Sequence, residues 1–263
     1  MMELAKTKIK RSFAAASSAY DGVAMLQRNV GINLLQRVVP GRFATVIDLG
    51  SGTGFLVQEF LDKYKFVKPG QFVALDIAMP MLNTARSKMK HTDSIDYLCA
   101  DVECLPFRAH VADLVLSNLV FQWCDSLEKT FNEVKRILKP EGQFVFTTFG
   151  ANTLHELKAA WQEVDDYAHV NTFCTSAQLT GHLQQAGFRD FELTSRTYDS
   201  CYESAWDLMA ELKQLGAHTV VAGANKHLTT RTAMQKMIGA YHKQDENGLV
   251  LATFEVITAV IRA

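Results

Sequence analysis

The sequence lacks several features that would assign it to a broad class at once. It has no Cys-x-x-Cys spacing, no H-E-x-x-H motif and no excess of charge of either sign. Its 263 residues carry 27 basic and 28 acidic side chains, a net charge of -1 at pH 7. Nucleic-acid-binding proteins concentrate positive charge, so we expect no nucleic-acid partner. The eight histidines are dispersed, and we expect no metal site.

Cysteine usage and hydrophobicity indicate a location. The cysteines are Cys99, Cys104, Cys124, Cys174 and Cys201. An odd number at scattered positions favours small buried side chains in a reducing compartment over disulfides. The first 11 residues are basic without the apolar stretch of a signal peptide, and no segment is apolar over the length of a membrane span. We therefore expect a cytoplasmic protein that does not contact a membrane.

The sequence does contain a glycine-rich turn after an apolar strand. Residues 46–54 read Val-Ile-Asp-Leu-Gly-Ser-Gly-Thr-Gly, and Asp76 ends a second apolar strand that starts at Phe72. The pattern is Gly-x-Gly-x-Gly, and Phe55 stands where a dinucleotide-binding turn needs its third glycine. Such a turn still lets a ligand approach the backbone closely, because glycine tolerates positive φ.

Two carboxylates beside this turn indicate the kind of ligand. Asp76 ends the second strand, where a carboxylate can accept hydrogen bonds from both hydroxyls of an unphosphorylated ribose. Asp48 adds a second acid, and the turn contains no Lys or Arg to pair with a polyphosphate. These features suit a nucleoside with an amino group and a positive centre, as S-adenosylmethionine has. The alternative is a tight strand-to-helix turn in an unrelated α/β protein.

Predicted strands and helices alternate as far as residue 149. Strands are expected at 44–49, 71–76, 95–100, 112–117 and 143–149. Two more are expected at 188–198 and 249–261, and the last is so apolar that it should lie inside the sheet. Ser126 is the expected N-cap of a helix that residues 139–142 end. The pattern predicts an α/β fold with a doubly wound, seven-stranded, mostly parallel Rossmann-like sheet.

Residues 150–248 interrupt this alternation with predicted helices. Thr153-x-x-Glu156 and Thr175-x-x-Gln178 are expected capping boxes at the starts of two of them. Segments 203–215 and 229–241 are expected to be two further amphipathic helices. Helices beside the carboxyl ends of strands can cover a ligand crevice. We therefore divide the chain into a cofactor-binding core (1–149, 188–198 and 249–263) and a helical lid for the substrate (150–187 and 199–248).

Four segments resemble the class I S-adenosylmethionine-dependent methyltransferases in order: 48–54, 76–82, 100–106 and 113–119. The resemblance implies that Asp101 hydrogen-bonds the adenine amino group and that Val102 lies against the ring. It also implies that Asn118 lies beneath the methionine moiety. The implied cofactor-binding set is Arg28, Asp48, Gly50, Ser51, Gly52, Gly54, Asp76, Ile77, Met81, Asp101, Val102 and Asn118.

Further segments carry a narrower resemblance over roughly residues 12 to 261. They include 13–28, 117–124, 138–142, 146–149, 154–165, 169–173 and 212–217. Together they resemble the malonyl-acyl-carrier-protein methyltransferases of biotin synthesis. The segment Asn118-Leu-x-x-Gln-Trp123 is far more specific than the glycine turn.

This resemblance implies methylation of the free carboxylate of malonyl-acyl-carrier protein, or of malonyl-coenzyme A, to a methyl ester. An unperturbed carboxyl group titrates near pH ~4, so the acceptor is already ionised at pH 7 and needs no general base. An alcohol acceptor would need a base or a metal. The alternatives are a methyltransferase of another small acceptor, such as a quinone precursor or free carboxylic acid, and a non-catalytic cofactor-binding subunit.

Five side chains are candidates for the acceptor end of the site, each with a structural alternative. Tyr20 could close over the methionine end of the cofactor and touch the substrate carboxylate, or simply pack. Arg28 could pair with the cofactor's carboxylate or be solvated. Gln122 and Trp123 could flank the acceptor, whereas Trp123 could belong to the core. Arg231 could grip the malonyl carboxylate or lie on the surface.

An acyl-carrier protein is acidic, so basic side chains should meet it. Candidates for that surface are Lys6, Lys8, Lys10 and Arg11, or the lid residues Lys213, Lys226, Lys236 and Lys243.

Overall fold

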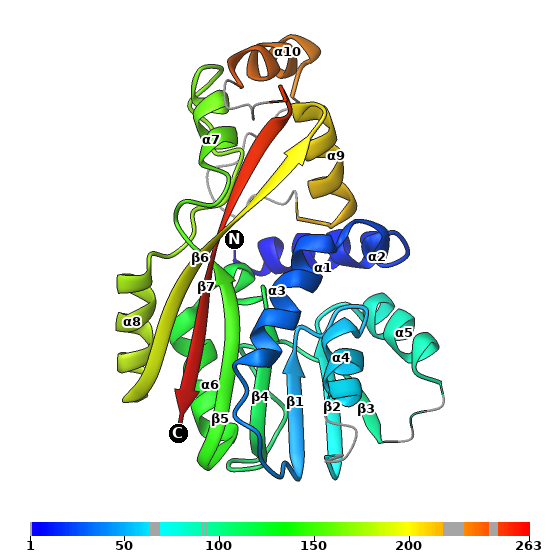
Figure 1. Ribbon diagram of the computed structural model, residues 1–263, viewed down its shortest axis with the longest axis vertical. Helices are drawn as coiled ribbons and strands as arrows, with labels where there is room; N and C mark the ends of the chain where they lie inside the picture. The colour runs from blue at the N-terminus through cyan, green and yellow to red at the C-terminus, as the bar shows by residue number, and fades with distance from the viewer. Residues whose placement is uncertain (1, 64–68, 91, 93, 218–228, 242–246) are drawn as a thin grey trace.

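A seven-stranded sheet of order β3-β2-β1-β4-β5-β7-β6 organises the chain (Figure 1). The computed structural model describes residues 2–63, 69–90, 92, 94–217, 229–241 and 247–263. The strands are β1 (Thr45–Leu49), β2 (Gln71–Asp76), β3 (Ile95–Cys99), β4 (Ala112–Asn118), β5 (Leu138–Phe149), β6 (Asp190–Tyr202) and β7 (Val250–Arg262). Strand β7 is antiparallel to both neighbours, and the other neighbouring strands pair in parallel. The predicted α/β fold is confirmed, as is the interior position of the last strand.

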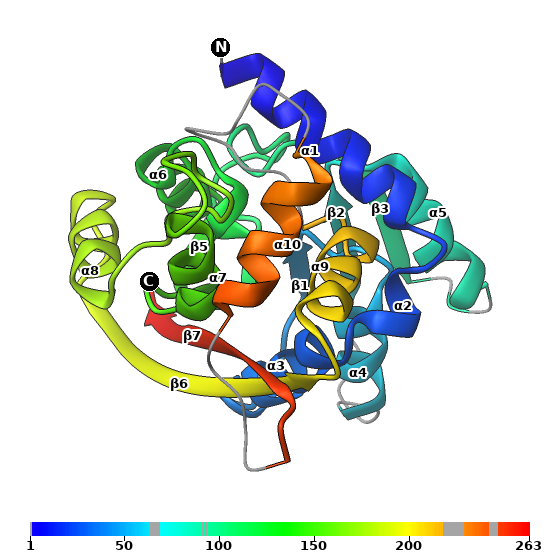
Figure 2. The same cartoon turned by 90° about the horizontal axis from the view of Figure 1, so that it is seen from above.

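Helices cover both faces of the sheet and its upper end (Figures 1 and 2). They are α1 (Met2–Ala16), α2 (Tyr20–Val23), α3 (Met25–Gln36), α4 (Phe55–Lys63), α5 (Met79–Lys88), a 3-10 turn η1 (Phe121–Trp123), α6 (Leu127–Ile137), α7 (His155–Gln162), α8 (Ser176–Gln185), α9 (Ala205–Gln214) and α10 (Arg231–Ala240). Helices α3, α4 and α5 pack on one face of the sheet, and α6 and α8 pack on the other.

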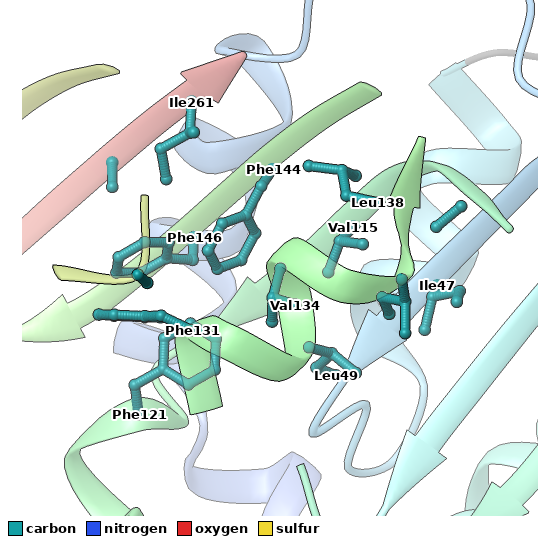
Figure 3. Packing of buried hydrophobic residues seen from close by; sticks show 14 of the residues in the cluster. Ile47, Leu49, Val115, Phe121, Phe131, Val134, Leu138, Phe144, Phe146 and Ile261 are labelled. Atoms are coloured by element: carbon teal, nitrogen blue, oxygen red, sulfur yellow. The ribbon is translucent and has the colours of Figure 1, made fainter. Parts of the chain in front are cut away.

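Alternate residues of each central strand fill two separate cores. Ile47 and Leu49 point toward α6, whereas Val46 packs among the side chains of α3 and α4. The α6 core contains a group of rings in which Phe144 and Phe146 stack with centroids 4.8 Å apart (Figure 3). Because both faces are covered, the strands read as nearly continuous apolar runs.

A third core lies beyond the carboxyl ends of the parallel strands. Helices α7, α9 and α10 contribute Leu157, Trp161, Leu208 and Met237, which pack against Phe254 of β7. Figures 1 and 2 show these helices above the upper edge of the sheet. In contrast, α8 packs in the main core with α6, although the sequence-based division assigned it to the lid. The division into core and lid stays a prediction.

The expected capping box at Thr153 is wrong. Helix α7 begins after Leu154, which has a φ of 54°, and no side chain caps it. The Thr153 hydroxyl instead donates to the carbonyl of Glu255 and accepts from its N–H, at 3.0 and 3.1 Å. Glu156 accepts a hydrogen bond from the backbone N–H of Thr253. The side chains of Thr153 and Glu156 therefore both bind the backbone of β7. The capping box expected from Thr175 and the N-cap expected from Ser126 are both present.

Candidate functional site

The three glycines of the turn do different work. Gly50 has a φ of 73°, and its N–H donates to the Leu75 carbonyl at 2.8 Å, which joins the turn to β2. Gly52 has a φ of 54°, and a Cβ there would meet nothing within 4 Å, so its backbone is open to a ligand. A Cβ on Gly54 would lie 2.9 Å from the Ala85 side chain. Gly54 therefore allows close packing against α5, and it lines no part of the crevice described next.

A crevice in two adjoining halves lies at the carboxyl ends of β1, β2 and β4. Tyr20, Gly50, Gly52 and Asn118 line both halves and join them. We call this the cofactor crevice. Of the predicted site residues, it is lined by Tyr20, Arg28, Asp48, Gly50, Ser51, Gly52, Asp76, Ile77, Met81, Asp101, Val102, Asn118 and Trp123.

Two buried acids face the glycine turn from β1 and β2. Asp76 accepts hydrogen bonds from the N–H groups of Gly52 and Ala78 at 2.9 and 2.8 Å. Burial raises the pKa of Asp76, and these N–H groups oppose that rise. Oδ2 of Asp48 is buried and has no hydrogen-bond partner among the described residues, and burial raises the pKa of Asp48 to about 7. An unpaired carboxylate oxygen in this place suits a ligand that carries an ammonium group.

Helix α1 forms the outer wall of the cofactor crevice. Lys6 pairs with Asp101 at 2.6 Å and with Glu103 at 2.9 Å, and Ile9 and Phe13 line the same wall. Lys6 was expected among the carrier-binding residues, but its charge is engaged in these ion pairs. Ile9, Phe13 and Glu103 were not predicted. The spacing of Lys6, Ile9 and Phe13 on one helical face is the signal that would have found this wall.

Arg28 is held against the glycine turn by α2. Its Nη2 donates to the Asp21 carbonyl at 2.7 Å and lies 3.4 Å from Oδ1 of Asp21. Its guanidinium carbon lies 5.6 Å from the centroid of the Phe55 ring. Asp21 also accepts from the Thr53 hydroxyl at 2.7 Å and pairs with Lys88. Asp21, which was not predicted, therefore fastens α2 and Arg28 over the turn.

A second cavity, which we call the upper cavity, adjoins the crevice under α7 and α9. It shares Trp123 with one half of the crevice and Gln27 with the other. Its described lining comprises Leu26, Gln27, Trp123, Phe149, Thr153, Leu154, Leu157, His169, Val170, Asn171, Phe173, Met209, Glu211, Leu212, Leu215, Ala217 and Phe254. The lining is mainly apolar, and none of these residues is Lys or Arg.

His169 is the most constrained polar side chain of the upper cavity. Its ring stacks on Trp161 with centroids 3.7 Å apart and planes 4° apart. Its Nε2 lies 2.9 Å from Oδ1 of Asp165. His169 lies in segment 169–173, one of the segments that carry the family resemblance, but no role is predicted for it from the sequence.

Two predicted acceptor residues lie outside both cavities. Gln122 donates from Nε2 to the Leu119 carbonyl at 2.7 Å and accepts from the Thr148 hydroxyl at 3.2 Å. It faces a separate cavity beside the N-terminus of α6. Arg231 is exposed at the start of α10. The predicted carrier-binding residues Lys226 and Lys243 lie outside the described residues.

The described part of the chain contains no group of three or more His, Cys, Asp or Glu side chains that could hold a metal ion. No helix in that part is long and apolar enough to cross a membrane.

Comparisons with known proteins agree with this geometry. A family model described as a methyltransferase domain matches residues 47–146. A malonyl-[acyl-carrier protein] O-methyltransferase of Methylococcus capsulatus is 39% identical over 253 residues, which cover 95% of this chain and 91% of the relative. The biotin biosynthesis bifunctional protein BioHC of Cellvibrio japonicus is 37% identical over 97% of this chain and 50% of its own length.

A solved structure extends the comparison to the fold. The phosphoethanolamine N-methyltransferase 2 of Haemonchus contortus, in complex with S-adenosyl-L-methionine, superposes with a TM-score of 0.58 at 16% identity. The match covers 94% of this chain and 57% of that one.

The sheet, the glycine turn and the two buried acids define a class I S-adenosylmethionine-dependent methyltransferase. Its cofactor is S-adenosyl-L-methionine. Within that class, the chain belongs to the malonyl-[acyl-carrier protein] O-methyltransferase family.

Proposed function

We propose that this chain transfers a methyl group from S-adenosylmethionine to the free carboxylate of a malonyl group that acyl-carrier protein carries as a thioester. The product is a malonyl methyl ester for biotin synthesis, made in the cytoplasm. The observation that carries the proposal is the apolar upper cavity, which meets the cofactor crevice only at Gln27 and Trp123 among the described residues. An acceptor in the upper cavity can reach the cofactor there.

The crevice residues suit the three parts of the cofactor. Asp76 would accept hydrogen bonds from the ribose hydroxyls, and Asp101 with Val102 would hold the adenine. The unpaired Oδ2 of Asp48 would accept from the ammonium group, and Arg28 would orient the carboxylate. When bound, the cofactor supplies a methyl group activated by a positive sulfur.

The protonation states near the junction favour an acceptor that is already ionised. Burial raises the pKa of the Tyr20 phenol above its usual value, and burial also raises the pKa of the Cys124 thiol to about 12. Both groups line the crevice and keep their protons at neutral pH. Neither can act as a general base there, whereas a carboxylate acceptor requires none.

The charges of the upper cavity favour a thioester over a free dicarboxylic acid. Glu211 lines this cavity, and its carboxylate accepts from the Tyr202 hydroxyl at 2.9 Å. A second negative charge on the acceptor would meet this acid without a lysine or arginine among the described lining residues. A malonyl thioester has one carboxylate and a neutral far end. Apolar surroundings also favour a transfer in which opposite charges are neutralised.

The proposed reaction can be tested by incubating the protein with S-adenosylmethionine and malonyl-acyl-carrier protein. We expect the carrier-bound acyl group to gain the mass of one methylene, and S-adenosylhomocysteine to form in equal amount. Acetyl-acyl-carrier protein, which has no free carboxylate, should not react. An Asp76→Ala variant should lose measurable cofactor binding and turnover. Methylation of a quinone precursor or of free malonate, but not of the carrier-bound substrate, would reject the proposal.

A further inference from the structure

Gln27 occupies an unusual place at the junction of the two cavities. It lies on α3, and its backbone carbonyl accepts from Nδ2 of Asn118 at 2.9 Å, which fixes its position at the end of β4. Gln27 lines both the cofactor crevice and the upper cavity. The amide oxygen is buried and has no partner among the described residues. A buried amide oxygen without a partner is costly, so a ligand that donates a hydrogen bond to it is expected.

Trp123 is the other side chain at this junction. Its backbone N–H donates to the Val120 carbonyl at 2.9 Å. Its ring and that of Phe13 are nearly perpendicular, with centroids 5.5 Å apart. Its indole N–H donates to no group within the described part of the chain. Gln27 on α3 and Trp123 on η1 therefore both bring neutral N–H donors to the lining of the upper cavity, and each also borders one half of the cofactor crevice.

We propose that the Gln27 amide and the Trp123 indole together hold the acceptor carboxylate against the methyl group. This inference rests on the proposed function. Each side chain donates one hydrogen bond to the carboxylate. A lone pair on a carboxylate oxygen that is not used in these hydrogen bonds remains free to attack the methyl carbon. An oxygen lone pair forms the O–CH₃ bond, and the electron pair of the breaking C–S bond returns to sulfur.

Neutral donors suit this reaction better than a cation. The acceptor carboxylate loses its charge during the transfer, so an arginine or lysine would stabilise the ground state more than the transition state and slow the step. A neutral N–H orients the oxygen with a smaller penalty. The proposal therefore accounts for the absence of Lys and Arg from the described lining of the upper cavity, to which Gln27 and Trp123 belong.

Gln27 can serve the cofactor side with the same group. Because it lines both cavities, its amide oxygen and amide N–H can face different ligands at once. The oxygen would accept from the polarised C–H groups beside sulfur or from the ammonium group. One side chain would then set the distance between acceptor and methyl group, a requirement of an in-line transfer.

The test compares Gln27→Ala, Gln27→Glu and Trp123→Phe, with Asn29→Ala as the matched control. Asn29 is an exposed amide on the same helix. Steady-state rates with malonyl-acyl-carrier protein give kcat and KM, and calorimetry with S-adenosylhomocysteine gives cofactor affinity. We expect kcat/KM to fall about 10- to 100-fold in Gln27→Ala and Trp123→Phe, with cofactor affinity reduced by less than about fivefold. Asn29→Ala should match the wild type.

The pH profile of Gln27→Glu separates acceptor binding from a structural role. A glutamate carboxylate would repel the acceptor at neutral pH, and its protonated form would donate as the amide does. We therefore expect its kcat/KM to rise as pH falls toward 5, while that of the wild type does not. A wild-type profile in Gln27→Glu, or unchanged kcat/KM in Gln27→Ala, would overturn the inference. If the wild type itself forms no ester, the proposed function has failed instead.

Discussion

Asp48 shows how one residue can serve binding at a cost in stability. Its side chain is almost fully buried, with an exposed fraction of 1%, and Oδ2 has no partner within the described part of the chain. Burial and the neighbouring charge of Asp76 raise its pKa from 3.8 to about 7. The unfolded chain releases this proton near pH 4, so the folded state without ligand is destabilised by this group as pH rises from 4 to 7.

Asp48→Asn should therefore stabilise the ligand-free protein and weaken cofactor binding. At pH 8 we expect the free energy of unfolding to rise by roughly 2 to 4 kcal/mol, and the gain to vanish below about pH 4, where both forms are neutral. Denaturant titrations across this pH range measure the effect.

Cofactor affinity should depend on the same proton. S-adenosylhomocysteine should bind the wild type more tightly as pH rises through 7, because the ionised acid attracts the ammonium group, and Asp48→Asn should lose this dependence. An increase in stability that is equal at pH 4 and pH 8 would contradict the assignment.

At the scale of elements, the ion pairs of Lys6 add a polar tie between α1 and the crevice. Burial of Lys6 lowers its pKa, but hydrogen bonds and the charges of Asp101 and Glu103 outweigh burial, so the net pKa is raised. The Glu103 side chain is 5% exposed, so removal of Lys6 leaves a poorly solvated acid behind. The pairs therefore tie α1 to the segment after β3.

Lys6→Met should loosen α1 while the sheet stays folded. We expect amide hydrogen exchange over residues 6–16 to become at least about tenfold faster, since a partly buried pair contributes more than an exposed one. Affinity for S-adenosylhomocysteine should fall severalfold, because Ile9 and Phe13 also line the crevice. Lys10→Met, an exposed change on the same helix, is the control. Equal exchange rates in the two variants would show that Lys6 does not anchor α1.

The elements also show what a sequence can predict. Local rules located every strand, the cap at Ser126 and the box at Thr175, because each depends on neighbouring residues. Strand β5 begins at Leu138, five residues before the expected start at 143, since Leu138 pairs with Ala112 across an irregularity in the ladder. The box at Thr153 failed because its partner, Glu255, is distant in sequence and satisfies the hydroxyl better.

The site follows the same rule. The glycine turn and the acids at strand ends were found because a strand fixes where its last residue lies. Gln27 was not among the predicted site residues, because the sequence alone does not show that α3 carries it to the lining of both cavities. Only the fold shows that Gln122 bonds to Leu119 and Thr148, while Gln27 lines both cavities.

For the whole molecule, the proposed function requires a carrier protein to approach the end of the sheet that carries the crevice. Helices α1, α9 and α10 lie at this end (Figure 2). The exposed basic residues on α1 are Lys8, Lys10 and Arg11, and those described on α9 and α10 are Lys213, Arg231 and Lys236. Lys6 is engaged in ion pairs. Lys8, Lys10 and Arg11 lie on the same helix as Ile9 and Phe13, which line the crevice.

Reversing Lys8, Lys10 and Arg11 to glutamate should impair use of the carrier-bound substrate. We expect kcat/KM for malonyl-acyl-carrier protein to fall about tenfold at low salt and less at high salt, because screening weakens long-range attraction. A small malonyl thioester should be used as well as by the wild type, since it carries no acidic protein.

The control reverses Arg42, Lys90 and Arg189, which are exposed in the loops before β1, β3 and β6, at the opposite end of the sheet. This variant has the same net charge, so it separates a local docking surface from a general charge effect. Equal losses in the two triple variants would indicate the general effect. Equal losses on carrier-bound and small substrates would mean that the α1 changes act on the crevice, through the wall that Ile9 and Phe13 form, and not on carrier docking.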